Sequence, residues 1–325
     1  MADEVVVTAG VAKRRKTKAN GMAIQPAGEE PAGKPDLDYV QTRSEQLAAI
    51  SRERKRAAEE EERAAAQQQL FPEWPEDRRG APNSIIRAAV FGVVRKGPRK
   101  RVVDMHIEAP EGWEVTLTGW RLDQADCDIY LELMHLARGV KPGEPVRFNL
   151  NSMLLAKLGR KGDGGNDRKW LIGRLEGLSQ TSCLIKNERF SGGSGSLIGA
   201  FQIDKKTGEA IVYTNPQSRP LFDFITYLDI NRRRELGGNQ LAKALHALIS
   251  THADWLPMRC DTLMKRLGAS YGELRFFRRD LKAVLTDFER RGWIDGWKIT
   301  SSDLIHIAIR PSPTQQRLLD RRDQT

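Results

Sequence analysis

Apolar and polar residues alternate along two stretches between residues 102 and 119. The apolar positions in these stretches are Val103, Met105, Ile107, Trp113, Val115 and Leu117. Between them lies Ala109-Pro110-Glu111-Gly112, in which Pro and Gly favour a turn. Because a period of two residues is typical of a half-buried strand, the pattern predicts a β-hairpin with one apolar face.

Further along the chain the apolar residues recur at helical spacing. Between residues 123 and 138, one side of a predicted helix carries Ile129, Leu133, Leu136 and Ala137. The elements predicted next are a strand at 146–148, a helix that Asn149 or Asn151 caps and that stops near Gly159, a helix at 166–180, and β-rich segments at 196–203 and 209–213. The order is helix, turn, helix, hairpin.

The same order returns in the C-terminal part. The predicted elements are helices at 221–228, 239–250, 260–267 and 273–291, followed by hairpin strands at 293–299 and 304–310. Gly268 and Gly292 end the last two helices. A short helix, a turn, a longer helix and a two-stranded wing make a winged helix-turn-helix. The predicted fold class is therefore α+β, with two tandem winged helix-turn-helix domains.

The N-terminal part differs in composition from the rest. Residues 1–38 hold few large apolar side chains and are expected to form a disordered tail. Residues 39–69 have good helix propensity but little apolar face, which predicts a solvated, partly formed helix or a charged spacer. The predicted domains are an arm at 1–70, winged-helix domains at 71–216 and 217–310, and a C-terminal tail at 311–325.

The predicted helix at 273–291 carries a cationic stripe. With about 100° per residue, its apolar residues fall within one arc and its basic residues fall within the adjacent arc. The basic residues are Arg275, Arg278, Arg279 and Lys282. An α-helix fits the major groove, and arginine binds guanine or phosphate, so the stripe predicts a DNA-binding surface. The alternative interpretation is a solvated basic surface.

Other candidates for DNA contact lie outside that helix. The polar side of the predicted helix at 166–180 holds Asn166, Arg168, Lys169 and Arg174. Arg232 and Arg233 precede the helix at 239–250 and are candidates for phosphate contact. Ordinary solvated charge is the alternative for both groups.

The net charge favours a polyanionic partner. The chain carries +10, and its basic and acidic residues balance over residues 1–70, so the excess lies on residues 71–325. No stretch approaches the ~20 apolar residues that cross a bilayer. Neither a signal peptide nor a disulfide framework is expected, so the sequence favours a cytoplasmic protein with no membrane partner.

Sequence signs of catalysis are missing. The Gly-rich segment 192–196 lacks the Gly-Lys-Ser/Thr ending of a phosphate loop, and its place between predicted strands indicates a flexible wing. The histidines and cysteines show no metal-ligand spacing. We expect a protein that is not an enzyme and that has no metal or cofactor; a nicking or nuclease enzyme is the least favoured reading.

The segment Gln67-Gln68-Gln69-Leu70-Phe71 has the form Gln-x-x-Leu-Phe. It closely resembles the peptide by which bacterial proteins dock on the replicase sliding clamp. Two adjacent large apolar residues can enter a pocket while the Gln67 amide supplies an oriented hydrogen bond. The alternative is that Leu70 and Phe71 anchor the arm to the first domain.

From about Gln67 to Ile309 the chain resembles the TrfA-type replication initiators of broad-host-range bacterial plasmids. The segments that carry the resemblance are QQQLFPEWPEDRRGAPNSIIRAAVFGV, VTLTGWRLDQADCDIYLELM, GEPVRFNLNSMLLAKLG and the helix from Arg278 to Ile294. The N-terminal 60 residues show no such match. The resemblance favours the clamp interpretation of Gln67, Leu70 and Phe71.

This resemblance implies a function as well as a fold. It implies two winged-helix domains that bind directly repeated sites, called iterons, in double-stranded origin DNA. It also implies active monomers and inactive dimers, opening of an A·T-rich segment, and recruitment of the host DnaA, the DnaB helicase and the clamp. In such initiators the second winged helix is the main reader of the repeat. A transcriptional repressor with the same DNA-binding domains is the alternative.

Overall fold

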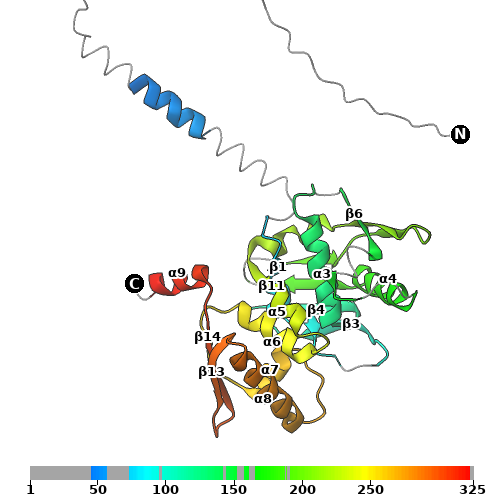
Figure 1. The fold of residues 1–325 in the computed structure, drawn as a ribbon, viewed down its shortest axis with the longest axis vertical. Helices are drawn as coiled ribbons and strands as arrows, with labels where there is room; N and C mark the ends of the chain where they lie inside the picture. Colours follow the sequence, from blue (N-terminus) through cyan, green and yellow to red (C-terminus); the bar gives the residue numbers. More distant parts are fainter. Residues whose placement is uncertain are drawn as a thin grey trace, which may run out of the picture. The chain divides into compact units, whose positions relative to one another are not determined.

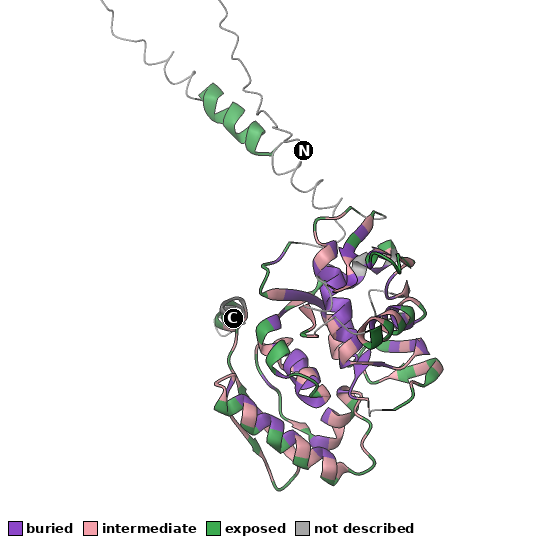
Figure 2. Cartoon of the chain, turned by 45° about the vertical axis from the view of Figure 1, so that its right-hand side comes forward, coloured by how far each residue is buried: buried purple, intermediate pink, exposed green. Residues whose placement is uncertain are grey.

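The computed structural model describes residues 45–56, 73–94, 97–141, 144–151, 157–160, 165–186, 188 and 191–322. The chain divides into two compact units, residues 1–59 and 60–325. In the first unit, residues 45–56 form a helix that is exposed along its whole length (Figure 2). This helix agrees with the solvated helix predicted for the arm. The tail predicted at 1–38 lies outside the described residues.

The first hydrophobic core of the second unit is built around α3 (Gln124–Ala137), which packs beside α4 (Gly165–Ser179) (Figure 1). Asp123 caps α3, because its carboxylate accepts from the backbone N–H groups of Ala125 and Asp126. Asp126 returns a bond to the Asp123 backbone and completes a capping box. A cap of this kind contributes about 1 kcal/mol to a helix.

Small sheets surround α3. The four-stranded sheet has the order β3 (Arg101–Ile107), β4 (Glu114–Trp120), β7 (Ser182–Lys186), β8 (Ser191–Ser196). A three-stranded sheet has the order β6 (Pro145–Asn149), β10 (Glu209–Tyr213), β9 (Phe201–Ile203). Two further pairs join β1 (Arg78–Pro82) to β11 (Ile225–Asp229) and β2 (Phe91–Gly92) to β5 (Leu122–Asp123), and α2 (Asn83–Arg87) follows β1. The hairpin predicted at 102–119 is confirmed as β3 and β4, but Val103 is 77% exposed and not on the apolar face, because the strand register shifts between Val102 and Met105.

The second core holds the C-terminal helices and a three-stranded sheet (Figure 1). Its helices are α6 (Gln240–Ser250), α7 (Cys260–Arg266) and α8 (Leu274–Arg290), and the short helix α5 (Ile230–Glu235) precedes them. The sheet has the order β12 (Met258–Arg259), β14 (Leu304–Ile309), β13 (Ile294–Ile299), and α9 (Pro313–Arg322) follows it. The predicted helices α6, α7 and α8 and the closing hairpin are confirmed.

Direct hydrogen bonds join the two cores. The Arg121 guanidinium donates to the carbonyls of Ala89 and Val90 on one side and of Gly268 on the other. Gly268 has φ 55°, and a Cβ placed there would meet the Arg121 side chain, so this turn after α7 needs glycine. The two cores are therefore parts of one compact unit rather than separate bodies.

Four predictions differ from the structure. Residues 216–223 form a 3₁₀ helix, η2, and β11 follows it, in place of the helix predicted at 221–228. Because β11 pairs with β1, Leu221, Phe222 and Leu228 pack in the first core, so the described residues show no division at the predicted boundary 216/217. Residues 192–196 belong to β8, and part of the predicted tail is helical as α9. For β11 the deciding partner is distant in sequence, because β1 supplies the hydrogen bonds, whereas β8 pairs with the neighbouring β7.

A buried histidine links Trp74 to α3. His135 Nδ1 accepts from Trp74 Nε1 at 2.9 Å, and its Nε2 lies 3.0 Å from the Glu76 carboxylate. With Nδ1 accepting, the ring is neutral and Nε2–H is the donor to Glu76. Burial, with the nearby Arg79 charge, lowers the pKa of His135 to about 4. Burial lowers the pKa of His246 in the second core to about 3.

Both histidines predict a loss of stability in mild acid. A folded-state pKa below the unfolded value means that the unfolded chain binds protons first as the pH falls below about 6.5. Each group then removes up to about 1.4 kcal/mol per pH unit until its folded-state pKa is reached. Urea unfolding at pH 7 and pH 5 should show the loss, and His135→Gln should reduce it. Equal free energies of unfolding at the two pH values would contradict the assignment.

Candidate nucleic-acid interface

Helix α8 separates an apolar side from a polar side. Its buried residues are Phe277, Leu281, Val284, Leu285 and Phe288. These residues pack into the second core, as the helical spacing predicts. Gly292, at φ 66°, follows the helix and ends it. Packing of the apolar side therefore directs the remaining side chains of α8 outward.

Three basic residues on the outward side are exposed. The side chains of Arg275 and Arg279 are each 70% exposed, and Lys282 is exposed as well. Arg275 pairs with Glu273 at 2.9 Å and Arg279 pairs with Asp280 at 2.8 Å. Ion pairs between exposed neighbours contribute little and are readily exchanged for another anion. These three side chains are therefore available to phosphate or to base edges.

Arg278 belongs to the same stripe but has a fixed partner. Its Nε and Nη2 donate to the two carboxylate oxygens of Asp303 at 2.7 and 2.8 Å. Asp303 lies in the turn between β13 and β14, and the hydrogen bond from Arg278 lowers its pKa below the usual range. The prediction of Arg278 as a free DNA contact needs correction, because its two-pronged ion pair already occupies the guanidinium.

The β13–β14 hairpin adds a second exposed surface in this part of the chain. Lys298 on β13 is exposed and pairs in register with His306 on β14. Ser301 and Ser302 at the turn are also exposed. Lys298 was not among the residues predicted to contact DNA, although alternation along the predicted strand places it on the solvent side. The Arg278–Asp303 pair joins the turn of this hairpin to the basic helix α8.

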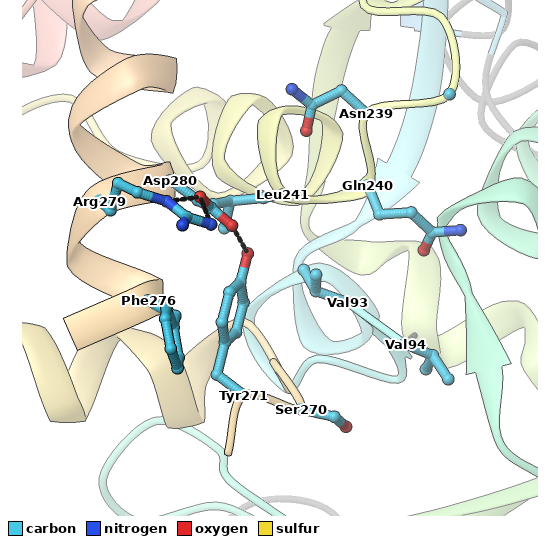
Figure 3. Close-up of a pocket in the computed structure, with 11 residues that line it drawn as sticks. Val93, Val94, Asn239, Gln240, Leu241, Ser270, Tyr271, Phe276, Arg279 and Asp280 are labelled. Carbon is cyan, nitrogen blue, oxygen red and sulfur yellow. Dashed lines mark hydrogen bonds and ion pairs between the residues drawn. The ribbon is translucent and has the colours of Figure 1, made fainter. Parts of the chain in front are cut away.

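A cavity of about 600 Å³ lies beside the first turns of α8 (Figure 3). Its lining includes Val93, Leu241, Tyr271 and Phe276. The Tyr271 hydroxyl donates to Asp280 at 3.1 Å, and Arg279 pairs with the other oxygen of that carboxylate. Figure 3 shows this chain of polar contacts at the edge of the cavity. The contacts orient Arg279 along the rim without burying its charge.

The candidates on α4 separate into two kinds. Asn166 and Lys169 are exposed, and Arg168 is half-buried with its Nε donating to the Asn151 side chain at 3.1 Å. Arg174 instead donates to Asp123 and Asp126 at 2.7 and 2.9 Å, and its side chain is only 16% exposed. The prediction of Arg174 as a DNA contact is therefore wrong, because the residue ties α4 to the capped end of α3.

The two α5 arginines differ from one another, and only Arg233 contradicts the prediction. Arg233 is 1% exposed, and its Nε lies 2.5 Å from Asp128. It also donates to the Gln124 side chain at 2.9 Å and to the Lys243 carbonyl at 3.1 Å, so it is a buried tie and not a phosphate contact. Arg232 remains 43% exposed, and its guanidinium lies over the Trp293 ring at 5.4 Å from the ring centroid, so its predicted phosphate contact stays a prediction. The sequence, a run of three consecutive arginines, did not predict the buried ion pair of Arg233 or the ring contact of Arg232.

Other expectations fall partly outside the described residues. The clamp-like residues Gln67, Leu70 and Phe71 lie there. Among the residues that the structure does describe, no group of three or more His, Cys, Asp or Glu side chains is placed to hold a metal ion. Within the same residues, no helix combines the length and apolar character required to cross a membrane.

Comparisons with known proteins come from solved structures. No family model matches the chain, and no curated protein sequence matches it either. The chain is similar to domains 2 and 3 of RctB, with a TM-score of 0.45, in a selenomethionine derivative at 13% identity over 64% of this chain and 86% of that chain. A second structure of these domains gives a TM-score of 0.45 at 11% identity over 72% and 99% of the two chains. The chain is also similar to the Pi initiator protein in complex with iteron DNA, with a TM-score of 0.45 at 10% identity over 73% and 99% of the two chains.

Proposed function

We propose that the chain is a replication initiator of the plasmid type that binds double-stranded origin DNA and has no catalytic activity of its own. The observation that carries this proposal is the exposed basic side of α8, on a helix whose opposite side is held in the second core. The excess positive charge of residues 71–325 is of the sign that a DNA ligand requires. The resemblance of residues 67–309 to TrfA-type initiators also supports the proposal.

In the proposed complex, two winged-helix modules contact the DNA. Helix α8 lies in the major groove, with Arg275, Arg279 and Lys282 toward the duplex and the β13–β14 hairpin as its wing. The first module contributes Asn166 and Lys169 from α4, which remain exposed. Directly repeated sites suit this arrangement, because each bound chain would present the same face to successive repeats.

Opening the origin requires several bound copies. Opening about 20 base pairs costs on the order of 28 kcal/mol at about 1.4 kcal/mol per stacking step. A specific site contributes about 11–15 kcal/mol, and only the part that differs between closed and open DNA drives opening. The free energy needed for opening therefore comes from several chains bound to an array of repeats, together with negative supercoiling, because one bound chain does not supply enough.

The proposed partners are host replication proteins. We propose that Gln67, Leu70 and Phe71 dock on the sliding clamp, and that the DNA-bound chain recruits DnaA and the DnaB helicase. The active form on DNA is a monomer, and a dimer of the chain is the inactive form that limits plasmid copy number. With these partners, we propose the bacterial cytoplasm as the location of the protein.

A plasmid-maintenance assay tests the proposal. The gene, joined to a DNA fragment that carries direct repeats beside an A·T-rich segment, should sustain replication of a plasmid lacking any other origin. Leu70→Ala with Phe71→Ala should abolish replication while duplex binding persists, because only the clamp contact is lost. Well-expressed wild-type protein that binds the repeats without sustaining replication would instead favour a transcriptional repressor. Nicking of supercoiled DNA by the purified protein would overturn the expectation of no catalysis.

A further inference from the structure

Asp303 joins three elements of the second core. Its carboxylate pairs with Arg278 on α8, its backbone carbonyl accepts from the Cys260 N–H at the start of α7, and the Cys260 thiol donates to the same carboxylate. The backbone of Asp303 is also constrained, because its φ is 65°, a region that residues other than glycine rarely adopt. The residue therefore holds a strained turn against two helices at once.

The turn itself is closed by its own hydrogen bonds. Asp303 N–H donates to the Thr300 carbonyl at 3.0 Å, and Thr300 N–H donates to the Leu304 carbonyl at 2.9 Å. The Thr300 hydroxyl accepts from the Leu304 N–H at 3.1 Å. These bonds determine the shape of the turn but not its position relative to α8. The position of the turn depends on contacts between the hairpin and other elements. One of these contacts is the Arg278–Asp303 ion pair, in which two guanidinium nitrogens donate to the carboxylate.

We propose that Arg278 is a positioning residue for DNA binding, which acts through Asp303 to hold the β13–β14 hairpin at a fixed place beside the basic side of α8. This inference rests on the proposed function, in which helix and hairpin engage one duplex. The neighbouring Arg275 and Arg279 pair only with residues one or two positions away and make the contacts to DNA themselves. The basic stripe thus contains residues that contact DNA and one residue, Arg278, that holds the β13–β14 hairpin in place before DNA binds.

Two different functions of the ion pair predict opposite results. If Arg278 positions the hairpin, removal of either partner releases the hairpin and weakens DNA binding. If Asp303 merely occupies a guanidinium that would otherwise bind phosphate, then removal of Asp303 frees a DNA contact. In that case binding becomes tighter, and the slope of log K against log salt steepens by about 0.9.

The first measurement uses the full chain without DNA. Arg278→Ala and Asp303→Ala should each accelerate hydrogen exchange of the β13–β14 amides by about tenfold or more, and the double variant should exchange no faster than either single variant. Arg279→Ala is the matched control, because its partner is the next residue, and it should leave that exchange unchanged. Additive effects of the two single substitutions would overturn the proposal.

The second measurement is binding to a mixed-sequence duplex of about 30 base pairs at several salt concentrations. Arg278→Ala and Asp303→Ala should each weaken binding about tenfold with an unchanged salt slope, whereas Arg279→Ala should reduce the slope by about 0.9. Arg278→Lys keeps the charge but not the two-pronged geometry, so it should resemble Arg278→Ala. Wild-type behaviour of Arg278→Lys, or tighter binding by Asp303→Ala, would overturn the proposal.

The two measurements separate this inference from the proposed function. If the wild-type chain fails to bind any duplex, the proposed function is wrong, and so is the DNA-directed role of Arg278. Coupled exchange would then still identify the ion pair as the link between α8 and the hairpin. If the wild type binds and the variants show uncoupled exchange, the proposed function survives and the positioning role is wrong.

Discussion

Arg233→Ala is expected to lower the free energy of unfolding by about 3–5 kcal/mol, the range typical of removing one partner from a buried ion pair. The Arg233 side chain is 1% exposed and pairs with Asp128 on α3. It also bonds to the Gln124 side chain and to the Lys243 carbonyl on α6, so its loss leaves three polar groups short of a donor. Lys243 Nζ remains 2.6 Å from Asp128, which favours the lower end of the range.

A surface arginine provides the matched control for this substitution. Arg290 on α8 is 69% exposed and pairs with Asp287 one turn away. Arg290→Ala should change the free energy of unfolding by less than about 1 kcal/mol, because exposed pairs contribute little. Urea unfolding of both variants measures the difference. A loss below about 1 kcal/mol for Arg233→Ala would show that the buried pair does not hold α5 against α3 and α6.

Simultaneous replacement of Arg275, Arg279 and Lys282 by alanine should lower duplex affinity about 100-fold, on the order of 1 kcal/mol per contact. The slope of log K against log salt should shrink by about 0.9 for each lost phosphate contact, roughly 2.7 in total. The physical reason is that each cation displaces a condensed counterion from the DNA. Fluorescence anisotropy with a labelled duplex at several salt concentrations measures both quantities.

The control variant removes the same charge from other positions. Arg290, Arg310 and Arg317 are exposed, and Arg290 lies at the opposite end of α8 from Arg275. Replacing all three by alanine lowers the net charge by the same amount as the α8 triple variant. It should therefore reproduce only the loss of affinity that comes from the lower net charge, and not the loss from direct contacts. Equal losses for the two triple variants would show that total charge, and not the N-terminal side of α8, governs binding.

Local patterns anticipated the elements that form the site. The spacing of Phe277, Leu281 and Val284 was enough to predict α8 and the side that it buries, because these positions follow the helix period. Gly292 marked its end, and alternation predicted the closing hairpin. The helix predicted at 221–228 failed because β1 lies beside residues 225–229 and pairs with them, although it precedes them by more than 140 residues.

The contacts of individual arginines were not predictable from the same patterns. Arg174 meets Asp123, Arg233 meets Asp128 and Arg278 meets Asp303, and each partner lies on another element. On a helical wheel these residues look like Arg275 or Arg279, whose charges remain exposed. Burial and pairing depend on which carboxylates the fold brings near, and no local spacing reports that.

The sequence by itself determined the helix and strand periods, the ends of α8 and the presence of a basic stripe, because each depends on residues within a few turns of one another. Only the tertiary structure decided which basic residues of that stripe and its neighbours are free to bind a ligand. Arg275, Arg279 and Lys282 are exposed, whereas Arg174, Arg233 and Arg278 are held by carboxylates. The reason is that an ion pair requires two side chains to meet in space, and packing of distant segments sets that meeting.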